Sequence, residues 1–390
     1  MERLSLPMDL AEDILSRVPA KTVARLRSTS KHWEALLKSG SFAKTHSANA
    51  PKEKPLIIML MDFRVYLVSM DLRGMHENNV APSFKIAAEL YLKDPLCNSS
   101  SQVDIRNVFH SDGLLLCTTK DNNLVLWNPC SGDTKWIKPR DRYKESDYFS
   151  LGYDDKKSSC RQYKILRVDR QDDARPIKNE YEVYDLSSNS WRVLGVATDW
   201  FLAAHRRGIS VKGITYWVAL DITQADQARE FLLSFDFSTE RFHSLSLALP
   251  HPFPFKNASL SVVGEEQLYL LGTDLKLWDT GYIGLSSFQA WVLSASTVWS
   301  KSLEVEGYKR YKFSDGMSFL VDEQTKVVMY LSPNNMLHIV GGNKHIQVDD
   351  LVGDSTCMSS CSVLLNYVPS LAQILQGSLP RGNKRKAPST

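Results

Sequence analysis

The chain opens with the stretch LPMDLAEDILSRVP at residues 6–19, which is followed by VARLRSTSKHW at residues 23–33. Leu10, Ile14 and Val18 recur at helical spacing, so the first stretch predicts a helix with an apolar stripe. A helical segment this short cannot bury all of its apolar side chains by itself. The stripe therefore docks either on the rest of the chain or on another protein.

Two prolines set the limits of the first helix. Pro7 is placed to open it, because the first helical N–H has no partner within the helix. Pro19 interrupts it, because a proline ring cannot occupy a helix interior. Val23, Leu26 and Trp33 continue the helical spacing, so more helix is expected beyond Pro19.

The order Leu-Pro-x-x-Leu-x-x-x-Ile-Leu-x-x-Val-Pro, followed by Leu-Arg-x-x-x-Lys-x-Trp, closely resembles the F-box of the large plant F-box family. That family often has Cys where this chain has Thr29 or Ser30, which exchanges one small residue for another. The resemblance implies an F-box at residues 1–46 that binds a Skp-family adaptor. The adaptor-binding residues that it implies are Leu6, Pro7, Leu10, Ile14, Leu15, Val18, Pro19, Leu26 and Trp33. An ordinary helical hairpin that packs only on its own domain is the alternative.

From about residue 55 the apolar pattern changes to the alternation of β-strands, and one unit recurs. Each copy has a short apolar strand, a polar turn and a returning aromatic residue. The aromatics Trp136, Trp191, Phe242 and Trp299 are 55, 51 and 57 residues apart, and weaker copies start at Val65 and Val328. Two hairpins in a period of about 50 residues form a four-stranded blade. The pattern predicts an all-β body, a β-propeller of about six blades. A β-sandwich pair or another irregular all-β body is the alternative.

The same body resembles the type 1 F-box-associated domain, which in plants is often linked with kelch-like repeats. The matching stretches are Gly113–Cys117, Leu126–Pro129, Trp191–Leu194, Gly213–Ala219 and Leu233–Phe237. They consist mostly of core aromatics and turn residues, so they imply architecture and not chemistry. The resemblance implies a substrate-recognition domain at residues 50–368. The residues after it predict a basic tail at residues 376–390.

Composition narrows the class of protein. Hydrophobic residues make up 43% and charged residues 23% of the 390, which is ordinary for a soluble globular protein. The net charge is +3, and the basic excess lies in the first 50 and last ten residues, so a broad nucleic-acid-binding face is not expected. The run 55–70 contains Asp62 and Arg64 and is too short to span a bilayer. The six cysteines form no paired framework and are expected to be reduced thiols.

Catalytic, cofactor-binding and metal-binding motifs are not recognisable in the sequence, so no cofactor or metal is expected. Two patterns leave other chemistry open. Carboxylates such as Asp141, Glu145, Asp147 and Asp221 could converge in the funnel of a propeller hydrolase. Basic and aromatic residues also interleave between positions 140 and 149, a pattern that can bind phosphate or bases but is more typical of a loop that contacts a protein.

Together these features predict a non-catalytic substrate-recognition subunit of a Skp–cullin–F-box ubiquitin ligase. Its partners would be a Skp-family adaptor, through it the cullin and RING subunits, and a target protein that the sequence does not name. A scaffold that binds the adaptor without degrading its partner is the alternative. The expected location is the nucleus, the cytoplasm or both. The basic residues Lys384–Lys386 are interpreted either as a nuclear import signal or as a disordered end that keeps the chain soluble.

Overall fold

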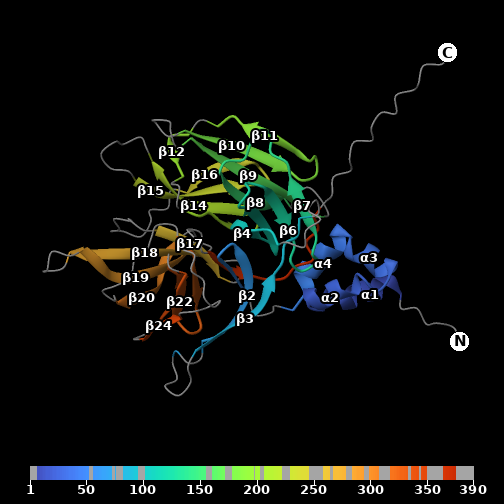
Figure 1. Ribbon diagram of the computed structural model, residues 1–390, viewed down its shortest axis with the longest axis horizontal. Helices are drawn as coiled ribbons and strands as arrows, with labels where there is room; N and C mark the ends of the chain where they lie inside the picture. Colours follow the sequence, from blue (N-terminus) through green and yellow to red (C-terminus); the bar gives the residue numbers. More distant parts are fainter. Residues whose placement is uncertain are drawn as a thin grey trace, which may run out of the picture.

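The computed structural model describes residues 7–51, 56–72, 75, 82–94, 102–154, 160–171, 178–196, 198–202, 206–221, 229–245, 258–263, 267–277, 283–293, 298–306, 317–332, 335–341, 344–348 and 363–374. Leu6 and the basic tail at 376–390 lie outside these residues. Four helices come first, and the strands that follow form six separate sheets (Figure 1). The order of a small helical module and an all-β body is as predicted.

The helical module consists of α1 (Met8–Ser16), α2 (Ala20–Leu26), α3 (Lys31–Leu37) and α4 (Gly40–Asn49). Pro7 and Pro19 stand immediately before α1 and α2, as the sequence predicts. The side chains of Ser30 and Ser39 cap α3 and α4, accepting hydrogen bonds from backbone N–H groups three residues further on. The two prolines and the two serine caps together mark where each of the four short helices begins.

Six antiparallel sheets make up the body. The first contains β25 (Val363–Tyr367), β1 (Leu56–Met61), β2 (Arg64–Asp71) and β3 (Ser83–Leu90). The second contains β4 (Ile105–Ser111), β5 (Leu114–Thr119), β6 (Leu124–Trp127) and β7 (Thr134–Ile137). The third contains β8 (Tyr148–Asp154), β9 (Gln162–Gln171), β10 (Lys178–Asp185) and β11 (Ser190–Leu194).

The remaining sheets repeat the arrangement. The fourth contains β12 (Trp200–Phe201), β13 (Ile209–Val211), β14 (Ile214–Asp221), β15 (Arg229–Asp236) and β16 (Arg241–Leu245). The fifth contains β17 (Ala258–Val263), β18 (Gln267–Leu277), β19 (Ile283–Leu293) and β20 (Trp299–Glu306). The sixth contains β21 (Phe319–Asp322), β22 (Val327–Leu331), β23 (Leu337–Gly341) and β24 (Lys344–Val348).

The sheets are the blades of a six-bladed β-propeller, which confirms the predicted fold. The ring is closed by the last strand, because β25 pairs with β1 from Leu56↔Tyr367 to Leu60↔Val363. The innermost strands of neighbouring blades contact one another across the centre. Closure of this kind removes the free edge that an open array of sheets would leave.

The recurring aromatics occupy equivalent places in the blades. Trp136, Trp191, Phe242 and Trp299 lie on β7, β11, β16 and β20, the outermost strands of four successive blades, and each packs on a core cluster. Of the two weaker copies, the one at Val65 lies on a third strand, as in the other units. The copy at Val328 lies on the second strand of its blade, not the third, so the prediction that it is an equivalent copy of the unit was wrong.

Two glycines make tight turns where the sequence places hairpins. Gly113 and Gly213 both have positive φ, 73° and 77°, between the first and second strands of their blades. A Cβ on Gly213 would lie 2.5 Å from the carbonyl oxygen of Tyr153, so the turn has no room for a side chain. Each turn fixes the entry of the chain into the second strand of its blade.

The innermost strands β25, β4, β8, β13, β17 and β21, with the residues just before β13, surround a central cavity of about 40 Å³. This volume holds a few water molecules and is too small for a drug-sized ligand. Asp141, Glu145, Asp147 and Asp221, the carboxylates of the hydrolase hypothesis, are not among the described residues that line it. Their convergence in a central funnel is therefore not observed.

His110, which lines the central cavity, should make the free energy of unfolding depend on pH. Its Nε2 accepts a hydrogen bond from the Gly113 N–H over 3.1 Å, and burial lowers the pKa of His110 to about 4. The unfolded chain takes up this proton near its ordinary pKa of about 6.5. We therefore expect the free energy of unfolding to fall as the pH drops from about 6.5 toward 4. Urea denaturation checks this, because His110→Gln retains an acceptor and should lose less stability on acidification than the unchanged protein. Equal losses in the two proteins would contradict the assignment.

Candidate functional site

An exposed apolar stripe runs along α1. Leu10 and Ile14 expose 48% and 47% of their surface, and Pro7 one turn earlier is also exposed. These residues are three and four positions apart, so they lie on the same face of the helix. Ala11, on another face, is buried in the module. Large apolar side chains this exposed on one helix face are typical of a protein-binding surface.

The structure divides the predicted adaptor-binding residues into two groups. Pro7, Leu10 and Ile14 are available to a partner, whereas Pro19 is half-buried. Leu15, Val18, Leu26 and Trp33 are also half-buried and pack against the core of the module itself. That core consists of Ala20, Val23, Leu36, Leu37, Phe42 and, from the far end of the chain, Leu371. The stripe that remains uncovered is thus narrower than the sequence pattern suggests.

The helical module docks on one defined face of the propeller. Arg27 in the module pairs with Asp133 in the β6–β7 turn at 2.6 Å. Arg161, just before β9, donates to the Ser47 hydroxyl at 3.3 Å and pairs with Asp112 in the β4–β5 turn. These contacts all lie at turns that follow the first or third strand of a blade. Figure 1 shows the four helices on one side of the ring, with α4 nearest to it.

The directions of the strands determine which loops lie on the opposite face of the propeller. Because neighbouring strands of a blade are antiparallel, the turn after the second strand and the connection to the next blade lie at the other edge. The described part of that face includes the β5–β6 turn at 120–123 and the loop 138–147 between β7 and β8. This face points away from the helical module, so its loops remain accessible when a partner holds α1.

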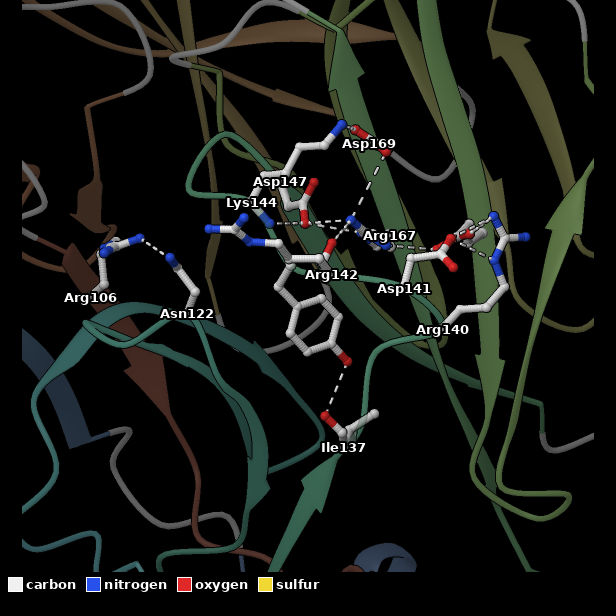
Figure 2. A network of polar contacts seen from close by, with 12 residues as sticks. Arg106, Asn122, Ile137, Arg140, Asp141, Arg142, Lys144, Asp147, Arg167 and Asp169 are labelled. Carbon is white, nitrogen blue, oxygen red and sulfur yellow. Dashed lines mark hydrogen bonds and ion pairs between the residues drawn. The ribbon is translucent and has the colours of Figure 1, made fainter.

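A buried ion-pair network fixes the loop 138–147 (Figure 2). At its centre, Arg167 on β9 donates from Nε to Asp147 over 3.0 Å and from Nη1 to Glu182 over 3.0 Å. Nη2 of Arg167 donates to the carbonyl oxygen of Arg142 over 2.8 Å. The Asp147 carboxylate also accepts the backbone N–H of Lys144 at 2.7 Å, and burial raises the pKa of this carboxyl. The network holds the middle of the loop, at Arg142, and its end, at Asp147, to the strands beneath it.

The interleaved basic and aromatic residues in this loop do not form a base-stacking surface. Tyr143, Tyr148 and Phe149 are buried in the propeller core, and the Tyr143 hydroxyl donates to the carbonyl oxygen of Ile137. Lys144 pairs with Asp169 at 2.7 Å. Arg140 pairs with Glu182 at 3.1 Å and with Asp141. The prediction that these aromatic residues could stack on bases was therefore wrong. Residues 138–147 form a loop between blades, and its contact with a protein stays a prediction.

Sequence reasoning missed the residues that organise both faces. Arg167 is buried at the centre of its network, and Leu371 enters the core of the module from a distance. A signal for Arg167 was present, because it is the single charge in the short apolar run from Ile165 to Val168. A buried charge needs a partner of opposite sign. No comparable local signal marks Leu371.

The comparisons with known proteins agree with this geometry. The model of the F-box domain matches residues 4–45, and that of the F-box associated beta propeller domain matches residues 56–374. This chain belongs to the F-box proteins with an F-box-associated β-propeller. An F-box protein of Arabidopsis thaliana is 54% identical over 380 residues, covering 96% of this chain and 100% of the relative. An F-box/kelch-repeat protein of the same plant is 38% identical over 408 residues, covering 95% of this chain and 98% of the relative.

A solved structure of the Aleuria aurantia lectin aligns with 76% of this chain and 94% of the lectin chain, with a TM-score of 0.40 and 10% sequence identity. This similarity is too low to inform function. F-box proteins generally act as substrate-recognition subunits of Skp–cullin–F-box ligases, and the F-box implies binding of a Skp-family adaptor. Within the described part of this F-box protein, no helix has the length and apolarity needed to cross a membrane.

Proposed function

We propose that this F-box protein is the substrate-recognition subunit of a Skp–cullin–F-box ubiquitin ligase and carries no catalytic group of its own. The observation that carries the proposal is the uncovered stripe of Pro7, Leu10 and Ile14 on α1. A Skp-family adaptor would cover it and connect the chain to cullin and RING subunits. The proposed adaptor-binding unit is the F-box at 1–46, and the proposed target-binding unit is the propeller at 50–368.

The two faces of the molecule suit this role. The adaptor stripe lies on the helical module, and the loops on the opposite face of the propeller are left for the target. A target held there would stay close to the ubiquitin-charged enzyme, which raises the effective concentration of its lysines. The chain then needs only to hold two partners at a fixed separation, because the chemistry belongs to other subunits.

Cells that express the full chain, or the full chain with Leu10→Asp and Ile14→Asp, test the proposal. Both forms retain the propeller and are expected to capture the same targets by mass spectrometry. Only the unchanged chain should also recover adaptor and cullin, and the shared targets should be less ubiquitinated and longer-lived with the variant. The substitution Val193→Asp, on an equally exposed strand residue, serves as the matched control.

A scaffold that binds the adaptor without degrading its partner is the second candidate. It predicts the same recovery of adaptor and cullin, but unchanged ubiquitination and lifetime of the captured proteins. Ubiquitin transfer by the purified chain without cullin or RING subunits would contradict both candidates.

A further inference from the structure

The residues that follow β25 also contribute to the structure. Residues Val368–Ile374, here called the strap, continue from that strand as neither helix nor strand, between the helical module and the propeller. The side chains alternate as in an extended chain. Leu371 and Gln373 face the helices, whereas Ala372 and Ile374 pack in the propeller core.

On the module side, the strap completes the F-box core. Leu371 is only 5% exposed and packs with Val23, Leu36 and Phe42. The side-chain amide of Gln373 donates to the carbonyl oxygen of Leu37 over 2.6 Å. Leu37 is the last residue of α3, where backbone carbonyls have no partner within the helix. The strap therefore supplies both an apolar side chain and a helix-end hydrogen bond to the module.

On the propeller side, one buried asparagine holds the strap. Nδ2 of Asn128 donates to the carbonyl oxygens of Ser370 and Ala372 over 3.1 and 3.0 Å, and Asn128 is fully buried. The Ser370 hydroxyl donates to the carbonyl oxygen of Asp112 over 2.6 Å. Beside it, a Cβ on Gly113 would meet Ser370 at 2.7 Å, so the glycine allows this close approach.

Cys130 of the β6–β7 turn packs against the module core, and Cys160 lies close to Gly40 of α4. The two polar contacts described above between module and propeller are weaker than those of the strap. The Arg27–Asp133 pair is about a third exposed on each side, and ion pairs in water contribute little to stability. The Arg161–Ser47 hydrogen bond is long at 3.3 Å and exposed. The strap thus contributes much of the buried, well-directed contact between the two parts.

We propose that the strap is a working part of the adaptor-binding module, so that adaptor affinity depends on residues at the opposite end of the chain. The strap keeps the F-box helices folded and fixed on the propeller. Weakening it lowers the fraction of molecules with a competent F-box, and apparent affinity falls by that fraction. The adaptor half of this inference rests on the proposed function, whereas the folding half does not.

Two near-isosteric substitutions in the full chain test the strap from both sides. Asn128→Asp removes the donors to Ser370 and Ala372 but keeps the oxygen that accepts the Cys130 N–H. Gln373→Glu removes the donor to Leu37 and sets a carboxylate against that carbonyl oxygen. Asn123→Asp, at an exposed position in a turn of the same blade as Asn128, is the matched control.

Hydrogen exchange in the absence of adaptor gives the first readout. Amides of α3 and α4 are expected to exchange about tenfold faster in both strap variants, while amides of β14 and β15 stay unchanged as an internal reference. Titration with a purified Skp-family adaptor gives the second readout, an expected loss of about tenfold in affinity. Unchanged exchange of α3 and α4 in both variants would overturn the inference. If the unchanged chain binds no adaptor, the proposed function fails, and the exchange data still decide whether the strap supports the module.

Discussion

The double variant Leu10→Asp/Ile14→Asp is expected to lose adaptor binding by more than about 100-fold while the protein stays folded. In the free protein both side chains are about half exposed, so the new carboxylates remain hydrated and cost little folding energy. In the complex the same carboxylates would be buried in an apolar contact without partners. Burying unpaired charge costs several kcal/mol, which is enough to remove a typical interface.

The measurement is titration of the adaptor into each purified protein, with thermal unfolding as the check on folding. Val193→Asp places the same charge on an equally exposed apolar residue of β11 and should bind normally. Leu15 is a poor choice for this test, because it packs on the core of the module and its loss would weaken the fold. Undiminished binding by the double variant would exclude the α1 stripe as the adaptor site.

Replacing Arg167 by methionine is expected to cost about 3–5 kcal/mol of unfolding free energy, because it leaves the Asp147 carboxylate buried without its cation and Glu182 with only the partly exposed Arg140. The loop 138–147 should loosen at the same time, since Arg167 also binds the Arg142 carbonyl oxygen. Urea denaturation measures the first effect and hydrogen exchange in the loop measures the second. A loss below about 1 kcal/mol would show that the network does not support the fold.

Arg140 supplies the matched control for Arg167. It pairs with the same Glu182 but is 42% exposed, so Arg140→Met should cost at most about 1 kcal/mol. The Arg167→Met deficit should also shrink at lower pH. Burial already raises the pKa of Asp147, and loss of the guanidinium raises it further. A carboxyl with a raised folded-state pKa binds its proton more tightly in the folded state, so acidification stabilises the variant relative to the unchanged protein.

Much of the architecture could be predicted because it is encoded locally. Proline positions and helical spacing determine where α1 and α2 begin, and the recurring aromatics identify the outermost strands of the blades. The stripe on α1 was also visible, because Leu10 and Ile14 follow helical periodicity whether or not a partner covers them. Periodicity reports a face of a helix, but it does not tell which apolar residues of that face the chain itself will bury. For this reason Leu15 and Trp33 could not be separated from Leu10 in advance.

The strap and the ion-pair network could not be predicted, because their partners are distant in sequence. Residues 371–374 form neither helix nor strand, because contacts on two sides, with the module and with the propeller, decide their conformation. The aromatic residues near Lys144 suggest an exposed surface. Tyr148 and Phe149 are nevertheless both buried, because β8 is an innermost strand with a neighbour on each face.

Because β25 closes the ring and the strap follows it, the fold can be completed only when the last part of the chain has been synthesised. The F-box helices leave the ribosome first, but 336 residues separate Leu37 from its partner Gln373. At about 5–20 residues per second, roughly 20–70 s pass before the strap can reach them. A nascent or prematurely terminated chain has neither a closed propeller nor a completed F-box core. On the proposed role of the strap, such a chain competes poorly for the adaptor pool, so finished molecules are favoured in ligase complexes.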